Sequence, residues 1–101
     1  MITLCIRYTL DFQKIDAFTT YAKGIKSGIE RCGGTYVGYY LPTKIAGLAN
    51  LAIGLIAFPD LATYQHYREK LAVDPEASGH LRDAMAAGCI INEERAFMQA
   101  L

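Results

Sequence analysis

The run LAIGLIAF, residues 51–58, is the feature that most restricts how this 101-residue chain can fold. It is far too short to cross a bilayer as a helix, which needs about 20 apolar residues. Strand-forming side chains and the small residues Ala52 and Gly54 make it a predicted strand. Because successive side chains of a strand point to opposite faces, a strand that is apolar throughout has to be covered on both sides.

The segments before this run show first the period of a strand and then that of a helix. Residues 2–9 alternate apolar and more polar side chains, which predicts a strand. Asp11 is expected to cap a helix that ends at Gly33-Gly34. The apolar stripe of this helix recurs at intervals of three and four and comprises Phe12, Ile15, Phe18, Ala22, Ile25 and Ile29.

Residues 35–41, TYVGYYL, are predicted to form a second strand that Pro42 ends. On a regular strand Tyr36 and Tyr40 share one face, and Tyr39 lies on the other. At least one of these two sets is expected to be ordinary packing between layers or subunits.

Two helices and a strand are predicted after residue 58. Pro59-Asp60 is expected to start a helix whose inner stripe is Leu61, Tyr64, Tyr67 and Leu71. Asp74-Pro75-Glu76 then resembles a new helix start, with a short helix near residues 77–87. Residues 90–99 alternate again and form the last predicted strand. The order is βαββα(α)β, an α+β, ferredoxin-like plan with a four-stranded antiparallel sheet in one domain, residues 1–101.

In this plan the helices cover one face of the sheet, and the other face stays open. The strands at residues 35–41 and 51–58 carry large or apolar side chains on both faces, so an open face of this composition demands a partner. Two copies that place these faces together satisfy twofold symmetry. We therefore expect a homodimer that pairs as a dimeric α/β barrel.

Composition excludes several classes of partner. Ten Lys and Arg balance ten Asp and Glu, so no basic field favours nucleic acid. An RNA-recognition module, which has the same order of elements, is rejected for this reason and because residues 51–58 hold a single terminal phenylalanine. No membrane segment, metal site or cofactor is predicted. Three cysteines without a C-x-x-C motif are expected to be buried thiols of a cytoplasmic protein.

Several short segments resemble the NIPSNAP family of the dimeric α/β-barrel superfamily. They are Arg7-Tyr8-Thr9-Leu10, GYYLP at residues 38–42, Phe58-Pro59-Asp60, YREKLAVDPE at residues 67–76, and Glu94-Arg95-Ala96-Phe97-Met98. The family start usually carries a Pro-Gly before the first helix, where this chain has Asp11-Phe12-Gln13-Lys14. The resemblance implies the ferredoxin-like fold and the dimer, and it brings no established catalytic motif.

Four residues are candidates for ligand binding. Arg68 lies beside the stripe of its helix near Tyr64, where it anchors a carboxylate or enolate, or else pairs with Glu69, Glu93 or Glu94. Arg7, on the more polar face of the first strand, either pairs with Glu93 or Glu94 or anchors a substrate. Tyr40, beside the Pro42 loop, offers a hydroxyl at a cavity mouth.

These residues are compatible with three functions. The first is a homodimer that binds a small apolar or aromatic molecule in a cavity beside the sheet. The second is a cofactor-independent monooxygenase or isomerase whose pocket uses Tyr40, Tyr64, Arg68 and Cys5. The third is a non-catalytic protein-interaction dimer. Catalytic residues cannot be assigned from spacing, and the two histidines, His66 and His80, are expected near the surface.

Overall fold

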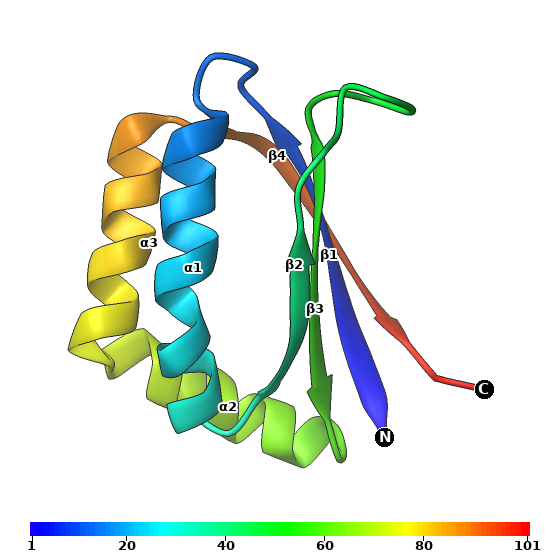
Figure 1. Ribbon diagram of the computed structural model, residues 1–101. Helices are drawn as coiled ribbons and strands as arrows, with labels where there is room; N and C mark the ends of the chain where they lie inside the picture. The colour runs from blue at the N-terminus through cyan, green and yellow to red at the C-terminus, as the bar shows by residue number, and fades with distance from the viewer.

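Three helices lie against one face of a four-stranded antiparallel sheet in the computed structural model, which describes residues 1–101 (Figure 1). The sheet order is β2-β3-β1-β4, with each neighbouring pair antiparallel. This arrangement confirms the predicted ferredoxin-like α+β fold. The elements are β1 (Ile2–Leu10), α1 (Ile15–Arg31), β2 (Thr35–Tyr40), β3 (Leu51–Phe58), α2 (Leu61–Val73), α3 (Pro75–Ala87) and β4 (Ile90–Met98).

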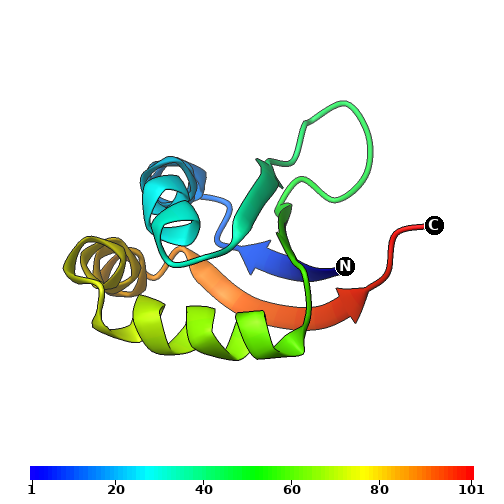
Figure 2. The same ribbon diagram turned by 90° about the horizontal axis from the view of Figure 1, so that it is seen from below.

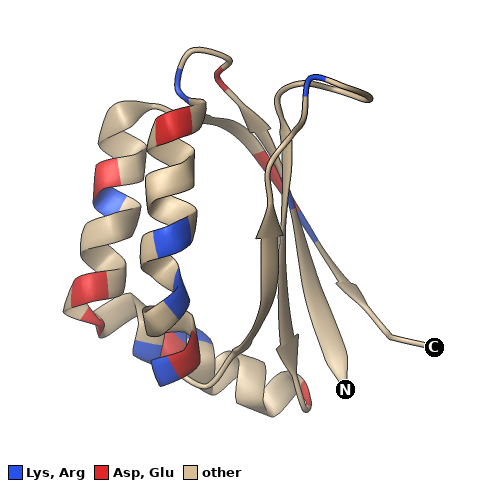
Figure 3. Cartoon of the chain, viewed as in Figure 1, with Lys and Arg blue, Asp and Glu red and all other residues tan.

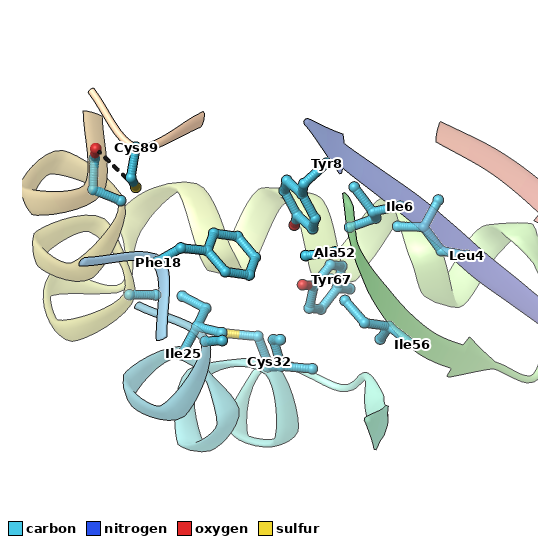
Figure 4. Close-up of a cluster of buried hydrophobic side chains, with 14 of the residues drawn as sticks. Leu4, Ile6, Tyr8, Phe18, Ile25, Cys32, Ala52, Ile56, Tyr67 and Cys89 are labelled. Atoms are coloured by element: carbon cyan, nitrogen blue, oxygen red, sulfur yellow. Dashed lines mark hydrogen bonds between the residues drawn. The ribbon is translucent and has the colours of Figure 1, made fainter. Parts of the chain in front are cut away.

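The core lies between the helices and the face of the sheet that they cover, which we call the inner face. Along β1, buried side chains alternate with more exposed ones, as the sequence predicts. Figure 4 shows Tyr8 and Ile6 of β1 in the space that Phe18 and Ile25 of α1 also fill. All three cysteines are free. Cys32 and Cys89 are buried as predicted and serve as small apolar core residues, whereas Cys5, on the other face of β1, is only partly buried.

The start of α1 differs from the prediction. The helix begins at Ile15, after Lys14, and the Asp11 carboxylate accepts a hydrogen bond from the Gln13 N–H (2.9 Å) in the preceding turn. Phe12 therefore lies outside the helix and is 65% exposed. The placement of Phe12 in the core stripe was wrong, because the chain completes a turn at Asp11 before the helical spacing can apply.

The predicted caps of α2 and α3 are confirmed. The Asp60 carboxylate accepts a hydrogen bond from the Thr63 N–H at 2.8 Å. Asp74 caps α3 in the same way by accepting from the Ala77 N–H at 2.9 Å, and Pro75 follows as the first helical residue. One residue, Asp74, thus separates α2 from α3 and turns the chain between them.

Asp74 also ties this turn to the end of α1. The Arg31 guanidinium donates two hydrogen bonds to the Asp74 carboxylate, from Nε at 2.9 Å and from Nη2 at 2.6 Å. Further along the same helices, Gly28 lets α1 approach α3 closely, because a Cβ at Gly28 would lie 3.0 Å from the Cβ of Ala77. The two helices are therefore held at a short distance, as Figure 2 shows end-on.

β2 contains a bulge that changes which tyrosines share a face. Tyr36 lies opposite Ile56, and Gly38 lies opposite Leu55, so Val37 is the extra residue. As a result Tyr36 and Tyr39 both point to the inner face, where their rings stack with centroids 5.5 Å apart. Tyr40 points to the opposite face. The prediction that Tyr36 and Tyr40 share a face was wrong, because one inserted residue reverses the alternation beyond it.

The other side of the sheet, which we call the open face, carries no helix (Figures 1 and 2). Charged residues lie mostly on the helices and connections (Figure 3), and four lie in strands: Arg7, Glu93, Glu94 and Arg95. Arg7 and Glu94 are opposite each other in the β1–β4 register and belong to the open face. None of the three helices is long and apolar enough to cross a membrane.

The link between α1 and the α2–α3 turn gives a test by pH. Asp74→Asn keeps a side-chain oxygen for the Ala77 N–H but removes the charge that pairs with Arg31. We expect the variant to melt at a lower temperature than the wild type at pH 7. The hydrogen bonds from Arg31, and then from Ala77, lower the pKa of the Asp74 carboxyl.

The sign of the pH dependence follows from that lowered pKa. The contribution is complete above about pH 4, the pKa of an unfolded aspartate, and is lost as the pH falls through the lower folded value. Differential scanning calorimetry between pH 7 and pH 2.5 is therefore expected to show the two melting temperatures converging in acid. Asp83→Asn, on the exposed side of α3, is the control. A gap of equal size at both pH values would contradict the role of the ion pair.

Candidate functional site

A cavity of about 440 Å³ lies between the inner face of the sheet and the helices. This volume falls within the range of about 300–1,000 Å³ that small-molecule sites occupy. Every helix and every strand contributes to its wall, which is mostly apolar. Its aliphatic lining residues are Leu4, Ile6, Ile25, Ile29, Ile56, Leu71, Ala72, Ala77 and Leu81.

Four tyrosines from four different elements bring polar groups into this cavity. Tyr8 comes from β1, Tyr21 from α1, Tyr39 from β2 and Tyr67 from α2. The hydroxyls of Tyr8 and Tyr39 are hydrogen-bonded to each other at 3.2 Å. Their rings, 6.0 Å apart, both pack near Phe18. The cavity therefore combines apolar walls with a cluster of phenol groups.

Burial keeps these phenol groups in their neutral form. It raises the pKa of Tyr21 to about 12, and it also raises the pKa values of Tyr8, Tyr39 and Tyr67 above the ordinary value of a phenol. The neighbouring phenols add to this effect, because each would repel the negative charge of an ionised neighbour. At physiological pH the cluster consequently offers hydroxyl groups that donate and accept hydrogen bonds.

Three arginines from three elements also line the cavity: Arg68 of α2, Arg82 of α3 and Arg95 of β4. Arg95 donates a hydrogen bond from Nε to the Glu93 carboxylate at 2.8 Å. Arg68 donates from Nη1 to the Tyr64 hydroxyl at 3.0 Å, and its guanidinium lies 5.9 Å from the centre of the Tyr64 ring. No carboxylate side chain is part of the cavity wall.

The structure divides the four predicted ligand-binding residues between the two faces of the sheet. Arg68 lines the cavity, and Tyr64 supports it through the hydrogen bond described above. Tyr40 and Arg7 lie on the open face, opposite Ile53 and Glu94, so they cannot share a pocket with Arg68. Cys5 also lies on the open face, because it alternates with the inner residues of β1, and it cannot line the same pocket as Arg68. The predicted pocket that combines Tyr40 and Cys5 with Tyr64 and Arg68 was wrong, because the sheet separates the first two residues from the other two.

The charged partners predicted for the arginines also differ from those observed. Arg7 makes no ion pair within the chain, although Glu94 is its neighbour in the register. Glu93 lies on the inner face and pairs with Arg95. Arg68 pairs with none of the three carboxylates considered for it and contacts Tyr64.

Sequence reasoning missed most of the cavity's polar groups, namely Tyr8, Tyr21, Tyr39, Tyr67, Arg82 and Arg95. One signal was present in β4. Glu93 and Arg95 occupy the same alternating positions as Phe97, whose ring packs on Tyr64 with centroids 4.8 Å apart. Charged residues on the core side of a strand indicate a polar site on that side. The convergence of the tyrosines depends on side-chain length and tertiary packing, which spacing does not reveal.

The histidines and acidic residues form no site for a metal ion. His66 is exposed on α2, and the His80 ring lies directly over Gly24, where a Cβ would come within 2.5 Å of it. No group of three or more His, Cys, Asp or Glu side chains is arranged to hold a metal. The chemistry available in the cavity is that of phenol hydroxyls, guanidinium groups and apolar contact.

The element order, the sheet order and the cavity define a ferredoxin-like α+β protein with a ligand-sized space between its layers. The family model described as NIPSNAP matches residues 3–101. The chain belongs to the NIPSNAP family, as its sequence segments predict. A search of curated protein sequences gives no match.

Solved structures confirm the fold. An uncharacterized NIPSNAP domain protein from Burkholderia xenovorans is 19% identical with a TM-score of 0.81, over 100% of this chain and 95% of that chain. A protein from Agrobacterium tumefaciens is 22% identical with a TM-score of 0.86, over 100% and 94%. A Nitrosomonas europaea protein, provisionally named an antibiotic biosynthesis monooxygenase, is 13% identical with a TM-score of 0.73, over 100% and 99%. At these identities the likeness concerns the fold.

The hydrogen bond between the two buried phenols gives a second test. Tyr8→Phe removes one hydroxyl and leaves that of Tyr39 without its partner, so we expect the free energy of unfolding to fall by about 1 kcal/mol. Urea unfolding followed by circular dichroism measures this difference. Thr43→Val, which removes an exposed hydroxyl from the loop after β2, is expected to change stability by less than about 0.5 kcal/mol. Equal effects of the two substitutions would show that the buried pair adds nothing.

Proposed function

We propose that this protein binds a small apolar or aromatic molecule in the cavity between its helices and the inner face of its sheet. The observation that carries the proposal is the cavity itself: about 440 Å³, with 13 hydrophobic residues among the 17 that line it. A few polar groups set among apolar walls are typical of sites that bind and orient small organic molecules.

The aromatic lining supports a flat or aromatic ligand in particular. Tyr8 and Tyr67 line the cavity, and both rings pack on neighbours, Phe18 for Tyr8 and Phe58 for Tyr67, at centroid distances of 4.8 and 4.9 Å. Rigid aromatic walls lose little conformational freedom when a ligand binds, which favours affinity.

Binding can be tested with N-phenyl-1-naphthylamine, a neutral fluorophore whose emission rises in apolar surroundings. We expect saturable binding of one molecule per chain. Ala72→Trp places a large side chain at an exposed position of the cavity wall and is expected to weaken binding at least about tenfold, since it occupies the space that the ligand needs.

Ala62→Trp is the matched control, because Ala62 is exposed on the same helix and does not line the cavity. It is expected to bind the fluorophore like the wild type. Unchanged binding by Ala72→Trp would place the fluorophore elsewhere and contradict the proposal. Recovery of a bound compound chemically unchanged after incubation in air indicates stoichiometric binding, whereas conversion of that compound would indicate an enzyme.

We also propose that two copies associate through their open faces. This face bears the apolar side chains of Ile53 and Leu55 on β3, with Tyr40 on the edge strand β2 and Met98 on the edge strand β4. Tyr40 and Met98 are 54% and 57% exposed. An exposed apolar surface of this kind is typical of an interface.

The charges of the open face favour a second copy of the same chain as the occupant. Its strands carry one cation, Arg7, and one anion, Glu94, and neither makes an ion pair within the chain. A twofold axis places identical surfaces together, so Arg7 of each copy can meet Glu94 of the other. The face is in this way complementary to itself.

Size-exclusion chromatography with light scattering tests this association. We expect a mass of twice the 11.1 kDa of one chain. Leu55→Arg places a charge at the middle of the open face and is expected to yield monomers at micromolar concentration, because an unpaired charge is costly to bury. Val73→Arg, at an exposed apolar position on α2, is expected to remain dimeric. A wild-type protein that elutes as a monomer would overturn the proposal.

A further inference from the structure

We infer that the natural ligand of the cavity is an organic anion, an apolar or aromatic body that carries a carboxylate or a similar acidic group, and this inference rests on the proposed function. Its basis is the convergence of Arg68, Arg82 and Arg95 on a cavity whose wall holds no carboxylate. These arginines come from α2, α3 and β4, so they are brought together only by the tertiary fold.

The local excess of positive charge stands out in this chain. The protein as a whole carries no net charge, with ten Lys and Arg against ten Asp and Glu. Arg31, at the far end of α1, is bound by Asp74, as a structural arginine is expected to be. The cavity wall instead contains three arginines, of which only Arg95 is paired with a carboxylate, that of Glu93. The two remaining charges are available to an anion.

Arg82 is the arginine with the greatest freedom to bind a ligand. It makes no ion pair and no side-chain hydrogen bond within the chain, although it lines the cavity beside Leu81 and Ser78. A guanidinium presents a planar set of N–H donors that matches the two oxygens of a carboxylate. Because Arg82 is solvent-exposed as well as part of the cavity wall, it places the acidic group of the ligand toward solvent.

Arg68 is also positioned to bind the acidic group of the ligand. Its hydrogen bond to the Tyr64 hydroxyl uses Nη1 and leaves its other N–H groups free. Tyr64 is itself packed between Phe58 and Phe97, at centroid distances of 5.2 and 4.8 Å, so the arginine is supported by a rigid ring. A preorganised donor binds an anion with a smaller loss of side-chain freedom.

The rest of the cavity determines what the anion is attached to. Beyond the arginines and Ser78 the wall is formed by aliphatic side chains from both layers and by the phenols of Tyr8, Tyr21, Tyr39 and Tyr67. An inorganic anion leaves this apolar surface unfilled, and a neutral hydrocarbon leaves the guanidinium groups without a partner. A carboxylate with an apolar body satisfies both parts of the site.

A matched pair of compounds tests the inference. 2-Naphthoate and its methyl ester have the same ring system and differ in charge, and each can compete with N-phenyl-1-naphthylamine for the cavity. We expect 2-naphthoate to bind the wild type at least about tenfold more tightly than the ester. Arg82→Gln is expected to weaken binding of 2-naphthoate about fivefold to tenfold and to leave binding of the ester unchanged, since a hydrogen bond to a charged group is lost.

Lys23→Gln is the control for a general loss of positive charge, because Lys23 is exposed on α1 and does not line the cavity. It is expected to bind both compounds like the wild type. Raising the salt concentration is expected to weaken binding of 2-naphthoate and to spare the ester. Melting temperatures of the two variants establish that both are folded.

The outcomes separate this inference from the proposed function. Equal binding of the acid and the ester to the wild type, unaffected by Arg82→Gln, would overturn the inference and leave the cavity as an apolar binding site. If Arg82→Gln weakens the binding of 2-naphthoate and of its methyl ester equally, the inference is likewise overturned. Arg82 would then contribute to the shape of the cavity and not to recognition of a negative charge. Failure of the fluorophore and of both compounds to bind would overturn the proposed function together with the inference.

Discussion

Three helices meet at the Asp74 carboxylate. The residue ends α2, its carboxylate accepts a hydrogen bond from the Ala77 N–H in the first turn of α3, and the same carboxylate receives two hydrogen bonds from Arg31 at the end of α1. This joint fixes the angle between α2 and α3 and holds the α2–α3 turn against α1. α1 and α3 are also in close contact at Gly28, and the cavity lies between this helical layer and the sheet.

The sheet gives each strand two separate environments. β1 presents Tyr8 to the cavity and Arg7, its direct neighbour, to the open face. The inner environment also depends on Gly54, since a Cβ at this position would come within 2.7 Å of the Tyr39 ring. The absence of a side chain there lets Tyr39 lie flat across β3 and reach the Tyr8 hydroxyl. The phenol cluster is thus a property of backbone as well as of side chains.

Much of the fold was predictable from local signals. The first and last strands followed from alternation, the two strands between them from strand-forming and apolar residues, and the starts of α2 and α3 from Asp60 and Asp74-Pro75. The prediction failed at two places where the periodic pattern is interrupted. The turn after Asp11 excludes Phe12 from α1, and the bulge at Val37 reverses the alternation of β2 and moves Tyr40 to the open face. Asp11 and Gly38 are residue types that favour a turn and a bulge, but their presence does not determine at which residue the helix begins or which residue the bulge inserts. Of the predicted ligand-binding residues, the structure places Arg68 at the cavity, with Tyr64 supporting it, because helical spacing correctly located both beside the core.

β4 has a further consequence for how the protein behaves among its own copies during folding. It lies at the edge of the sheet and pairs with β1 alone, so one side of its backbone presents unpaired N–H and C=O groups along nine residues. Such an edge invites the addition of a foreign strand. The consecutive charges of Glu93, Glu94 and Arg95 occupy the middle of this edge, on both faces of the strand. The same residues that shape the cavity and the open face therefore also protect the chain from aggregation.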